Sequence, residues 1–191
     1  MLLPDCTLFP HGGLPLYIFE ERYRLMLADA LAGDCIFAVG RLSGEGGKQA
    51  ISPIGTAGLI RASREREDGT SELLLHGVIR VRFIEWLDDK PYPCALIEPL
   101  LSEPMDGRKG EAAMATLRGT VEDAIAHLPE EVRKGVSALL DQADDPGLMA
   151  DLVAQQFVHE PELRQRILET LPPGERISQI CGFFEGLEAG E

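Results

Sequence analysis

The stretch LFPHGGLPLYIFEERYRLM, from Leu8 to Met26, contains the change of pattern that decides how the fold begins. Its prolines and glycines turn an extended chain sharply, because proline restricts the backbone and glycine permits conformations closed to other residues. Leu16 and Ile18 are expected to feed the core from the extended part, and the residues from Glu20 onward start a helix. The stretch therefore predicts a turn, an extended segment and a helix in quick succession.

The helix is predicted over Glu20–Leu31. Its apolar side chains recur at helical spacing, at Tyr23, Met26, Leu27, Ala30 and Leu31. Glu20 and Glu21 lie in the first turn, where the helix dipole favours negative charge. Gly33 supplies a stop at the carboxyl end.

The remainder of the first half has the pattern of strands. Short apolar runs of strand length cover Cys35–Leu42, Ile54–Ala62, Glu72–Trp86 and Tyr92–Pro99. The pair Asp68–Gly69 between the second and third runs predicts a hairpin turn. Gly55 and Gly58 indicate a bulge or a close approach of backbone. Pro93 favours an edge position for the last strand.

The clearest alternation is VIRVRFIEW, from Val78 to Trp86. Side chains of a strand point to opposite faces in turn. We expect Ile79, Val81 and Phe83 to be buried and the arginines to face solvent. Together with Arg61, Arg64 and Arg66, those arginines form either a basic patch or a mixed-charge solvated face, and the neighbouring Glu65, Glu67 and Asp68 favour the second.

The second half is predicted to be helical. A polar linker at Ser102–Gly110 precedes amphipathic patterns over 111–128 and 130–143. Asp145–Pro146 then supplies a helix cap followed by proline at the first helical position, opening a helix through His159. Glu160–Pro161 and Pro173–Gly174 punctuate two further helices. We therefore divide the chain into a strand-rich domain, 1–102, and a helical domain, 103–191.

Charge and hydropathy exclude several classes of function. The formal charge is −14, shared as 10 basic and 14 acidic side chains (−4) in residues 1–102 and 8 and 18 (−10) in 103–191. Such an acidic surface repels phosphate backbones, so nucleic-acid binding is disfavoured. No apolar run approaches the roughly 20 residues that span a membrane. The start of the chain lacks a basic leader, so we expect a cytoplasmic protein.

Motifs for catalysis or cofactor binding are absent from the sequence. It has neither a phosphate-binding loop, nor G-x-G-x-x-G, nor G-x-S-x-G, and Ser43–Lys48 is interpreted as a flexible hairpin tip. The histidines and cysteines are isolated, at His11, His76, His127 and His159 and at Cys6, Cys35, Cys94 and Cys181. The cysteines are expected to be buried thiols rather than disulfides or zinc ligands. We expect no metal, no cofactor and no enzymatic activity.

The opening stretch resembles the N-terminal domain of Lon-type proteases, a family that typically shows F-P-G-x-x-L-P-L-x-I-F-E-x-R-Y. Here His11 stands where the family usually has glycine. Ile54-Gly55-Thr56, Gly77–Arg82 and Tyr92–Ala95 are similar to later strands of that family. Leu148–Leu171 and residues 175–187 are similar to its closing helices, so the resemblance covers essentially the whole chain.

The resemblance implies an α+β fold: a PUA-like, mainly antiparallel β-barrel with one inserted helix, followed by a C-terminal α-helical bundle. It also implies recognition of unfolded or tagged polypeptides. Because the sequence ends at Glu191, before any ATPase or Ser–Lys protease module, we expect a free-standing, non-catalytic adaptor or quality-control factor. Its partners would include a separate protease or chaperone, and the apolar helices suit either an intramolecular bundle or a homo-oligomer.

The predicted contact surface for polypeptides is the rim formed by Phe9, His11, Leu14 and Tyr17. An alternative interpretation is that Leu14, Leu16 and Ile18 simply fill the core. Two other functions remain open. A PUA-like fold is compatible with RNA binding, and a barrel mouth is compatible with a small ligand.

Overall fold

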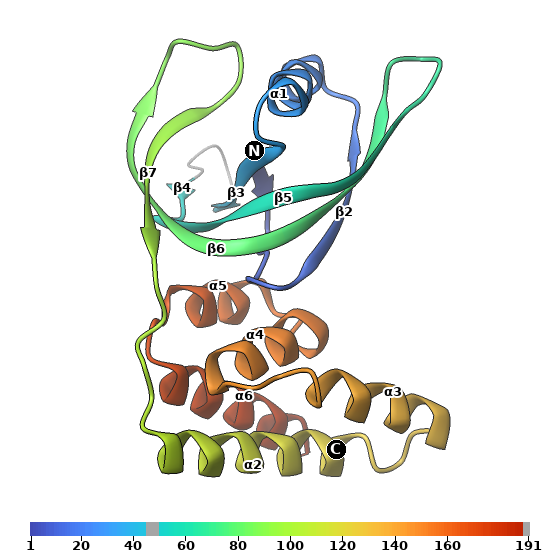
Figure 1. The fold of residues 1–191 in the computed structure, drawn as a ribbon, viewed down its shortest axis with the longest axis vertical. Coiled ribbons are helices and arrows are strands. Elements are labelled where there is room, and N and C mark those ends of the chain that lie inside the picture. The colour runs from blue at the N-terminus through green and yellow to red at the C-terminus, as the bar shows by residue number, and fades with distance from the viewer. Residues whose placement is uncertain (45–49, 189–191) are drawn as a thin grey trace. The chain divides into compact units, whose positions relative to one another are not determined.

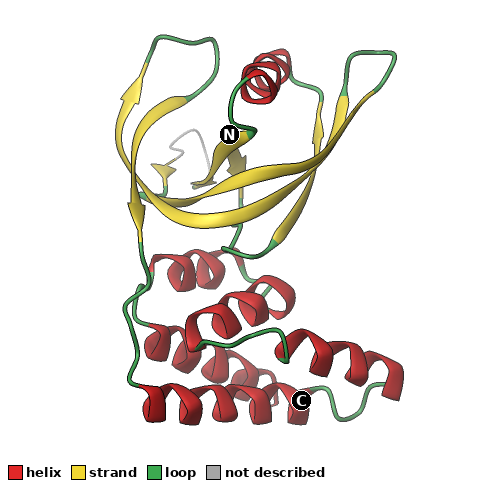
Figure 2. Ribbon diagram, in the orientation of Figure 1, coloured by secondary structure: helices red, strands yellow, loops and turns green. Residues whose placement is uncertain are grey.

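The structure is a computed structural model that describes residues 1–44 and 50–188 (Figure 1). The chain forms two compact units, residues 1–101 and 102–191. Within the described residues the first unit contains one helix among its strands, and the elements of the second are all helices (Figure 2). The α+β class is therefore observed. The proposed hairpin tip at Ser43–Lys48 falls largely outside the described residues.

The first unit contains α1 (Glu21–Ala32) and a sheet of seven strands. The strands are β1 (Leu2–Pro4), β2 (Gly13–Ile18), β3 (Ile36–Ser43), β4 (Ala50–Ile51), β5 (Ile54–Glu65), β6 (Ser71–Leu87) and β7 (Cys94–Leu100). The predicted helix and strands are confirmed, whereas β1 and β4 were not predicted. Gly69 has a φ of 76° in the turn that joins β5 to β6, as expected for the Asp68–Gly69 pair.

The longest strand, β6, organises the sheet (Figure 1). Along one edge it pairs antiparallel with β5, and along the other it pairs with β2 through residues 71–76 and with β7 through residues 80–87. On the far side of β5 in the sheet lies β3, which pairs antiparallel with β5. β1 pairs with β3 in parallel. The ends of the sheet are therefore β1 on one side and β2 with β7 on the other.

The expected closure into a barrel is not seen among the described strands, which form an open sheet. At the β1 end, the Tyr23 hydroxyl donates to the Leu2 carbonyl oxygen at 2.9 Å and lies 3.2 Å from the Leu2 amide nitrogen, which donates to it. A buried side chain thus takes the place that a neighbouring strand would occupy. This substitution gives a physical reason why the sheet stops at β1.

Alternation of side chains builds the core on one face of the sheet. Ile18 from β2, Val39 from β3 and Leu75 from β6 are fully buried, and α1 contributes Tyr23 and Met26 to the same cluster. Burying apolar area of this kind is the main favourable contribution to folding, at about 25 cal/mol per Å². The core therefore holds α1 in a fixed position against the sheet.

The expectation that the arginines of β6 face solvent is wrong for Arg80, which is 2% exposed. A bulge opposite Ala57 and Gly58 leaves Val78 without a partner. One extra residue reverses the alternation, so Arg80 enters the face that Leu75 occupies before the bulge. On the opposite face Val81 is buried, as predicted.

The glycines of β5 act as the sequence indicated. A Cβ on Gly55 would lie 2.2 Å from the Val39 carbonyl oxygen and 2.9 Å from the Phe83 ring, so only glycine fits beneath that ring. Gly58 lies at the bulge.

The second unit packs five helices around an apolar core. They are α2 (Gly107–Ala124), α3 (Glu130–Leu140), α4 (Pro146–Phe157), α5 (Pro161–Glu169) and α6 (Pro173–Glu188). Asp145 caps α4 as predicted, since its Oδ1 accepts from the amides of Gly147 and Leu148 at 2.7 and 3.0 Å. A buried ion pair joins Arg176 to Asp151 at 2.5 Å.

Candidate functional site

Of the four predicted contact residues, one is buried and a second is half-buried. Phe9 is 0% exposed. Leu14 is half-buried and packs against the core cluster, as Leu16 does. The alternative interpretation, in which the leucines of this stretch fill the core, therefore describes their positions. Phe9 therefore offers no surface to a polypeptide in this structure, whereas Leu14 keeps part of its side chain accessible.

His11 is exposed in the turn before β2, with a φ of 63°. Its amide donates to the Gly77 carbonyl oxygen at 2.8 Å, which anchors the turn on β6. The pKa of the neighbouring His76 is lowered by burial, by Arg61 and by His11. A lowered pKa keeps His76 uncharged at neutral pH, and nothing in this geometry makes it a base for a nucleophile.

Tyr17 lies on the outer face of β2, where it is 47% exposed. Its ring stacks on Phe19 with centroids 6.0 Å apart, and the Arg66 guanidinium lies 5.4 Å from its centroid. Pro15, two residues earlier, is directly opposite the exposed Leu74 of β6. Tyr17 thus belongs to a small apolar surface, separate from Phe9 and Leu14.

A deeper apolar groove lies on the flank of α1 that faces β3 and β7. Its volume is about 300 Å³, and its walls come from β1, α1, β3 and the β6–β7 hairpin. The apolar wall residues that remain accessible are Ile36, Trp86 and Ile97, with Phe83 stacked on Trp86 at 5.0 Å. Large accessible apolar side chains around a hollow are typical of a binding site.

Polar groups mark one end of this groove. Asp29 of α1 accepts hydrogen bonds from the Tyr92 hydroxyl at 2.5 Å and from Lys90 Nζ at 3.0 Å. The hydrogen bond from Tyr92, followed by Lys90, lowers the pKa of Asp29, and the same carboxylate raises the pKa of Tyr92 to about 12. These contacts tie the loop before β7 to α1.

Burial shifts the pKa of two potentially reactive groups of the groove. Burial raises the pKa of the Cys94 thiol, so the thiol stays protonated at neutral pH. Burial also lowers the pKa of the Met1 amino group to about 5, so the group is an uncharged amine at neutral pH, and it donates to the Ala38 carbonyl oxygen at 2.6 Å.

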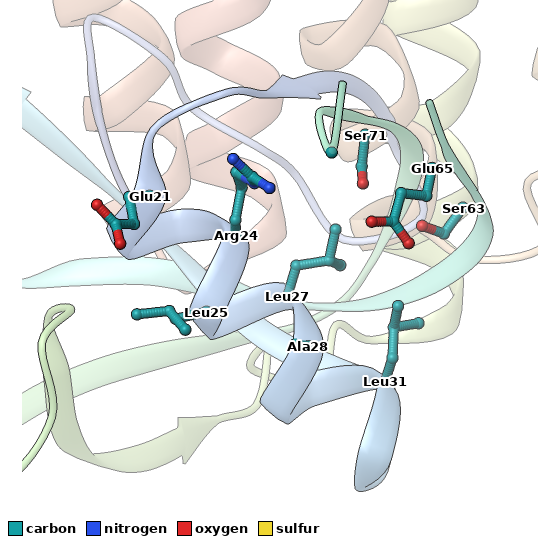
Figure 3. Close-up of a pocket in the computed structure, with 10 residues that line it drawn as sticks. Glu21, Arg24, Leu25, Leu27, Ala28, Leu31, Ser63, Glu65 and Ser71 are labelled. Carbon is teal, nitrogen blue, oxygen red and sulfur yellow. The ribbon is translucent and has the colours of Figure 1, made fainter. Parts of the chain in front are cut away.

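A second hollow, of about 460 Å³, lies on the other flank of α1, against the β5–β6 hairpin (Figure 3). Leucines of α1 form one wall, and Ser63 and Glu65 project from β5 opposite Arg24. The Arg24 guanidinium lies so close to Gly69 that a Cβ there would be 2.1 Å from Nη2. With Glu21 also on the rim, this hollow mixes both signs of charge.

The arginines of β5 and β6 were expected to form either a basic patch or, as favoured, a mixed-charge face. Arg66 pairs with Glu72 and Arg82 lies 3.9 Å from Glu98, while Arg80 is buried. The mixed-charge interpretation is therefore the better description of this face.

No group of three His, Cys, Asp or Glu side chains that could hold a metal ion occurs in residues 1–44 and 50–188. All four cysteines are free thiols and partly buried. Among the helices of those same residues, none is long and apolar enough to cross a membrane.

The groove was missed by the sequence interpretation because its residues come from separate segments. Ile36 begins β3, Trp86 lies one residue before the end of β6, and Ile97 lies in β7. The signal that was available is Trp86, a large apolar residue on the face of VIRVRFIEW that was assigned to solvent. An exposed tryptophan is a stronger sign of a contact surface than an exposed leucine.

The open sheet, the helix packed on it and the following helical unit define an α+β protein with an apolar groove in its first unit. The sequence profile of the ATP-dependent protease La (LON) substrate-binding domain matches residues 1–185. The chain belongs to this family.

Similarity to known Lon proteases extends over nearly the whole chain. The Lon protease of Trichlorobacter lovleyi is 29% identical over an alignment of 187 residues, and the match covers 94% of this chain and 23% of that protein. The Lon protease of Escherichia coli K12 is 27% identical over 187 residues, covering 96% of this chain and 24% of that protein. The chain thus spans about a quarter of the length of these relatives.

A solved structure has the same fold. The N-terminal domain of Mycobacterium avium complex Lon protease superposes with a TM-score of 0.78 at 12% identity, covering 97% of this chain and 96% of that one. At this identity the similarity establishes the architecture alone.

Proposed function

We propose that this chain is a non-catalytic polypeptide-recognition module that binds exposed apolar segments in the groove between α1, β3 and β7. The observation that carries the proposal is the set of accessible apolar side chains, Ile36, Trp86 and Ile97, around one hollow. Unfolded polypeptides differ from folded ones in exposing apolar side chains, so such a groove selects for them.

The family supports the same class of ligand, since its description names a substrate-binding domain. The relatives are proteases, whose substrates are polypeptides. By extension, we propose an adaptor or quality-control role in the cytoplasm, in which the groove holds an unfolded or tagged polypeptide for a protease or chaperone. The acidic charge of −14 favours neutral or basic segments over acidic ones.

Tyr17 and His11 remain a secondary proposed contact surface. Tyr17 offers an accessible aromatic ring, and His11 is exposed in the turn that precedes the same strand. Aromatic side chains contribute disproportionately to protein contacts.

The test compares groove variants with a surface control. Fluorescently labelled, reduced and carbamidomethylated α-lactalbumin serves as the unfolded polypeptide, and binding is followed by anisotropy. Trp86→Ala combined with Ile36→Ser is expected to weaken binding at least about tenfold, as expected for loss of a contact worth about 1.4 kcal/mol. Ile84→Ala is the matched control, because Ile84 is 58% exposed on the same strand and is not among the residues that line the groove.

Equal binding by the groove variant and the wild type, with both folded by circular dichroism, would remove the groove from the proposal. The Tyr17→Ala/His11→Ala double variant tests the secondary surface in the same assay. Loss of binding there, with the groove variant unaffected, would transfer the function to the outer face of β2.

A further inference from the structure

The strand β7 has one edge that no strand covers. It pairs with β6 along residues 80–87, and no other pairing or backbone hydrogen bond to Cys94–Leu100 is found within the described residues. An uncovered edge presents unpaired N–H and C=O groups and is a template for another extended chain.

The direction of these backbone groups follows from a contact of β6. The Phe83 amide donates to the Pro53 carbonyl oxygen at 3.0 Å, so the backbone of Phe83 faces β5 and turns away from β7. In an antiparallel ladder, directly opposite residues point either toward each other or both away. Ile97 is opposite Phe83, and its N–H and C=O therefore point to the uncovered edge.

Pro99 agrees with this assignment. It is opposite Val81, two residues from Phe83 on β6, and thus has the same orientation as Ile97. Proline has no N–H, and within a sheet it is confined to positions where that N–H would face away from the neighbouring strand. Ala95 has the same orientation two residues before Ile97, so the edge offers the N–H groups of Ala95 and Ile97 and the C=O groups of Ala95, Ile97 and Pro99.

The same residues connect the edge to the apolar groove. Phe83, Ala95 and Ile97 all line it. Side chains of adjacent strands lie in register on a shared face, so every second side chain of a chain added beside β7 would project on the face of Ile97. The edge and the groove therefore form one continuous surface.

The other end of the sheet lacks such an edge. The outward N–H and C=O of Leu2 on β1 are both held by the Tyr23 hydroxyl. Of the two sides of the groove, β7 therefore offers main-chain N–H groups to a ligand, whereas the outward N–H of Leu2 on β1 is already bonded and Pro4 has none.

We propose that an extended apolar segment of a polypeptide binds as an additional strand along β7, with alternate side chains in the groove. This inference rests on the proposed function and specifies the form of the ligand. Main-chain hydrogen bonds supply affinity that is independent of sequence, and the groove requires apolar residues only at every second position. Many different unfolded chains meet this requirement.

A second copy of this chain is the competing occupant. Two copies each carry −14, and their mutual repulsion opposes pairing of β7 with β7. A neutral or basic segment experiences no such repulsion. The charge therefore favours a foreign polypeptide.

The peptide test uses a fluorescent peptide of about ten residues in which valine and serine alternate, with a lysine at each end. Three forms are compared: unmodified, N-methylated at the valines, and N-methylated at the serines. N-methylation deletes alternate donors. One methylated form is expected to bind at least about tenfold more weakly and the other within about threefold of the unmodified peptide. Equal affinities of the two methylated forms would overturn strand addition.

The protein test compares Ile97→Pro with Ile97→Ala. Both variants lose the side chain, and only proline also removes the outward N–H, as Pro99 already does. Ile97→Pro is expected to bind the unmodified peptide at least about fivefold more weakly than Ile97→Ala. Equal binding by the two folded variants would overturn the assignment of the edge.

The outcomes separate the two proposals. One outcome is that the unmodified peptide binds, that Trp86→Ala lowers its affinity, and that the two methylated forms bind equally. This result would support the groove as the binding site and contradict strand addition. If neither the peptide nor unfolded lactalbumin binds the wild type, the proposed function itself fails. A wild-type dimer in sedimentation that Ile97→Pro dissociates would assign the edge to a second copy and overturn the inference.

Discussion

The Tyr23 hydroxyl holds both outward-facing backbone groups of Leu2, as acceptor at 3.2 Å and as donor at 2.9 Å. Tyr23 is 3% exposed and belongs to the core, while its hydroxyl reaches the last strand of the sheet. One phenol oxygen therefore satisfies a donor and an acceptor that an open sheet would otherwise leave unpaired.

Tyr23→Phe is expected to lower the free energy of unfolding by about 1–2 kcal/mol, because two partly buried backbone groups lose their partner while the ring stays. Urea denaturation measures the difference. Tyr17→Phe is the control, since its hydroxyl bonds Thr70 at an exposed position. That variant should change stability by less than about 0.5 kcal/mol. Equal stability of Tyr23→Phe and the wild type would contradict the role assigned to the hydroxyl.

Replacing one partner of the buried pair Arg176–Asp151 should lower the free energy of unfolding much more than replacing both partners by apolar residues. Arg176 is fully buried, and it also donates to Ser102 Oγ at 2.8 Å. Arg176→Met leaves a buried carboxylate without its cation and is expected to cost about 3–5 kcal/mol. Urea denaturation followed by circular dichroism at 222 nm reports on this helical unit.

The double variant Arg176→Met/Asp151→Leu is expected to recover most of that loss, because an apolar pair of similar size needs no charge compensation. Destabilisation by the double variant equal to the sum of the two single changes would show that the two side chains do not act as a pair.

The link between Asp29 and Tyr92 predicts a dependence of stability on pH at both extremes. Asp29 has a lowered pKa, so its contribution is present above its ordinary value of 3.8 and is lost as the pH falls through the folded-state value. Tyr92 has a raised pKa of about 12, so its contribution is complete below its ordinary value of 10.0 and is lost as the pH rises toward 12.

The difference in melting temperature between wild type and Asp29→Asn should therefore be constant from about pH 5 to pH 9 and shrink beyond both limits. Absorbance at 295 nm should show that Tyr92 ionises at a higher pH in the wild type than in Asp29→Asn. A difference in melting temperature that persists unchanged at pH 11 would contradict the link to Tyr92.

Substitution by alanine should change the stability of the protein in opposite directions at Gly69 and at Gly135. Gly69 has a φ of 76° and lies beneath the Arg24 guanidinium, so Gly69→Ala is expected to cost about 1–2 kcal/mol. Gly135 is exposed within α3 and has open space where a Cβ would lie. Gly135→Ala should stabilise by up to about 1 kcal/mol. Thermal unfolding of both variants tests the pair, and a stabilising Gly69→Ala would be incompatible with the described turn.

Local chemistry made much of the fold predictable. The Leu8–Met26 stretch predicted β2 and α1 in order, Asp68–Gly69 predicted the long hairpin, and Asp145–Pro146 predicted the start of α4. Each of these features depends on residues within a few positions of one another, because turns and caps are local structures.

Features that depend on distant residues were not predictable. β1 is only three residues long, and its identity as a strand depends on β3 and on the Tyr23 hydroxyl. Arg80 is buried because a bulge near Val78 reverses the alternation that the sequence pattern alone implied. The groove combines segments some 60 residues apart in sequence, Ile36 and Ile97. Such pairings are set by tertiary structure and leave no local signature.

The two compact units are each continuous in sequence, meeting at Leu101 and Ser102. During synthesis, every strand of the first unit therefore leaves the ribosome before any helix of the second is complete. Domains generally fold as units during translation, the N-terminal one first. The groove of a nascent chain can consequently form while the residues of the second unit are still being synthesised. The parallel pairing of β1 can form as soon as β3 has been synthesised.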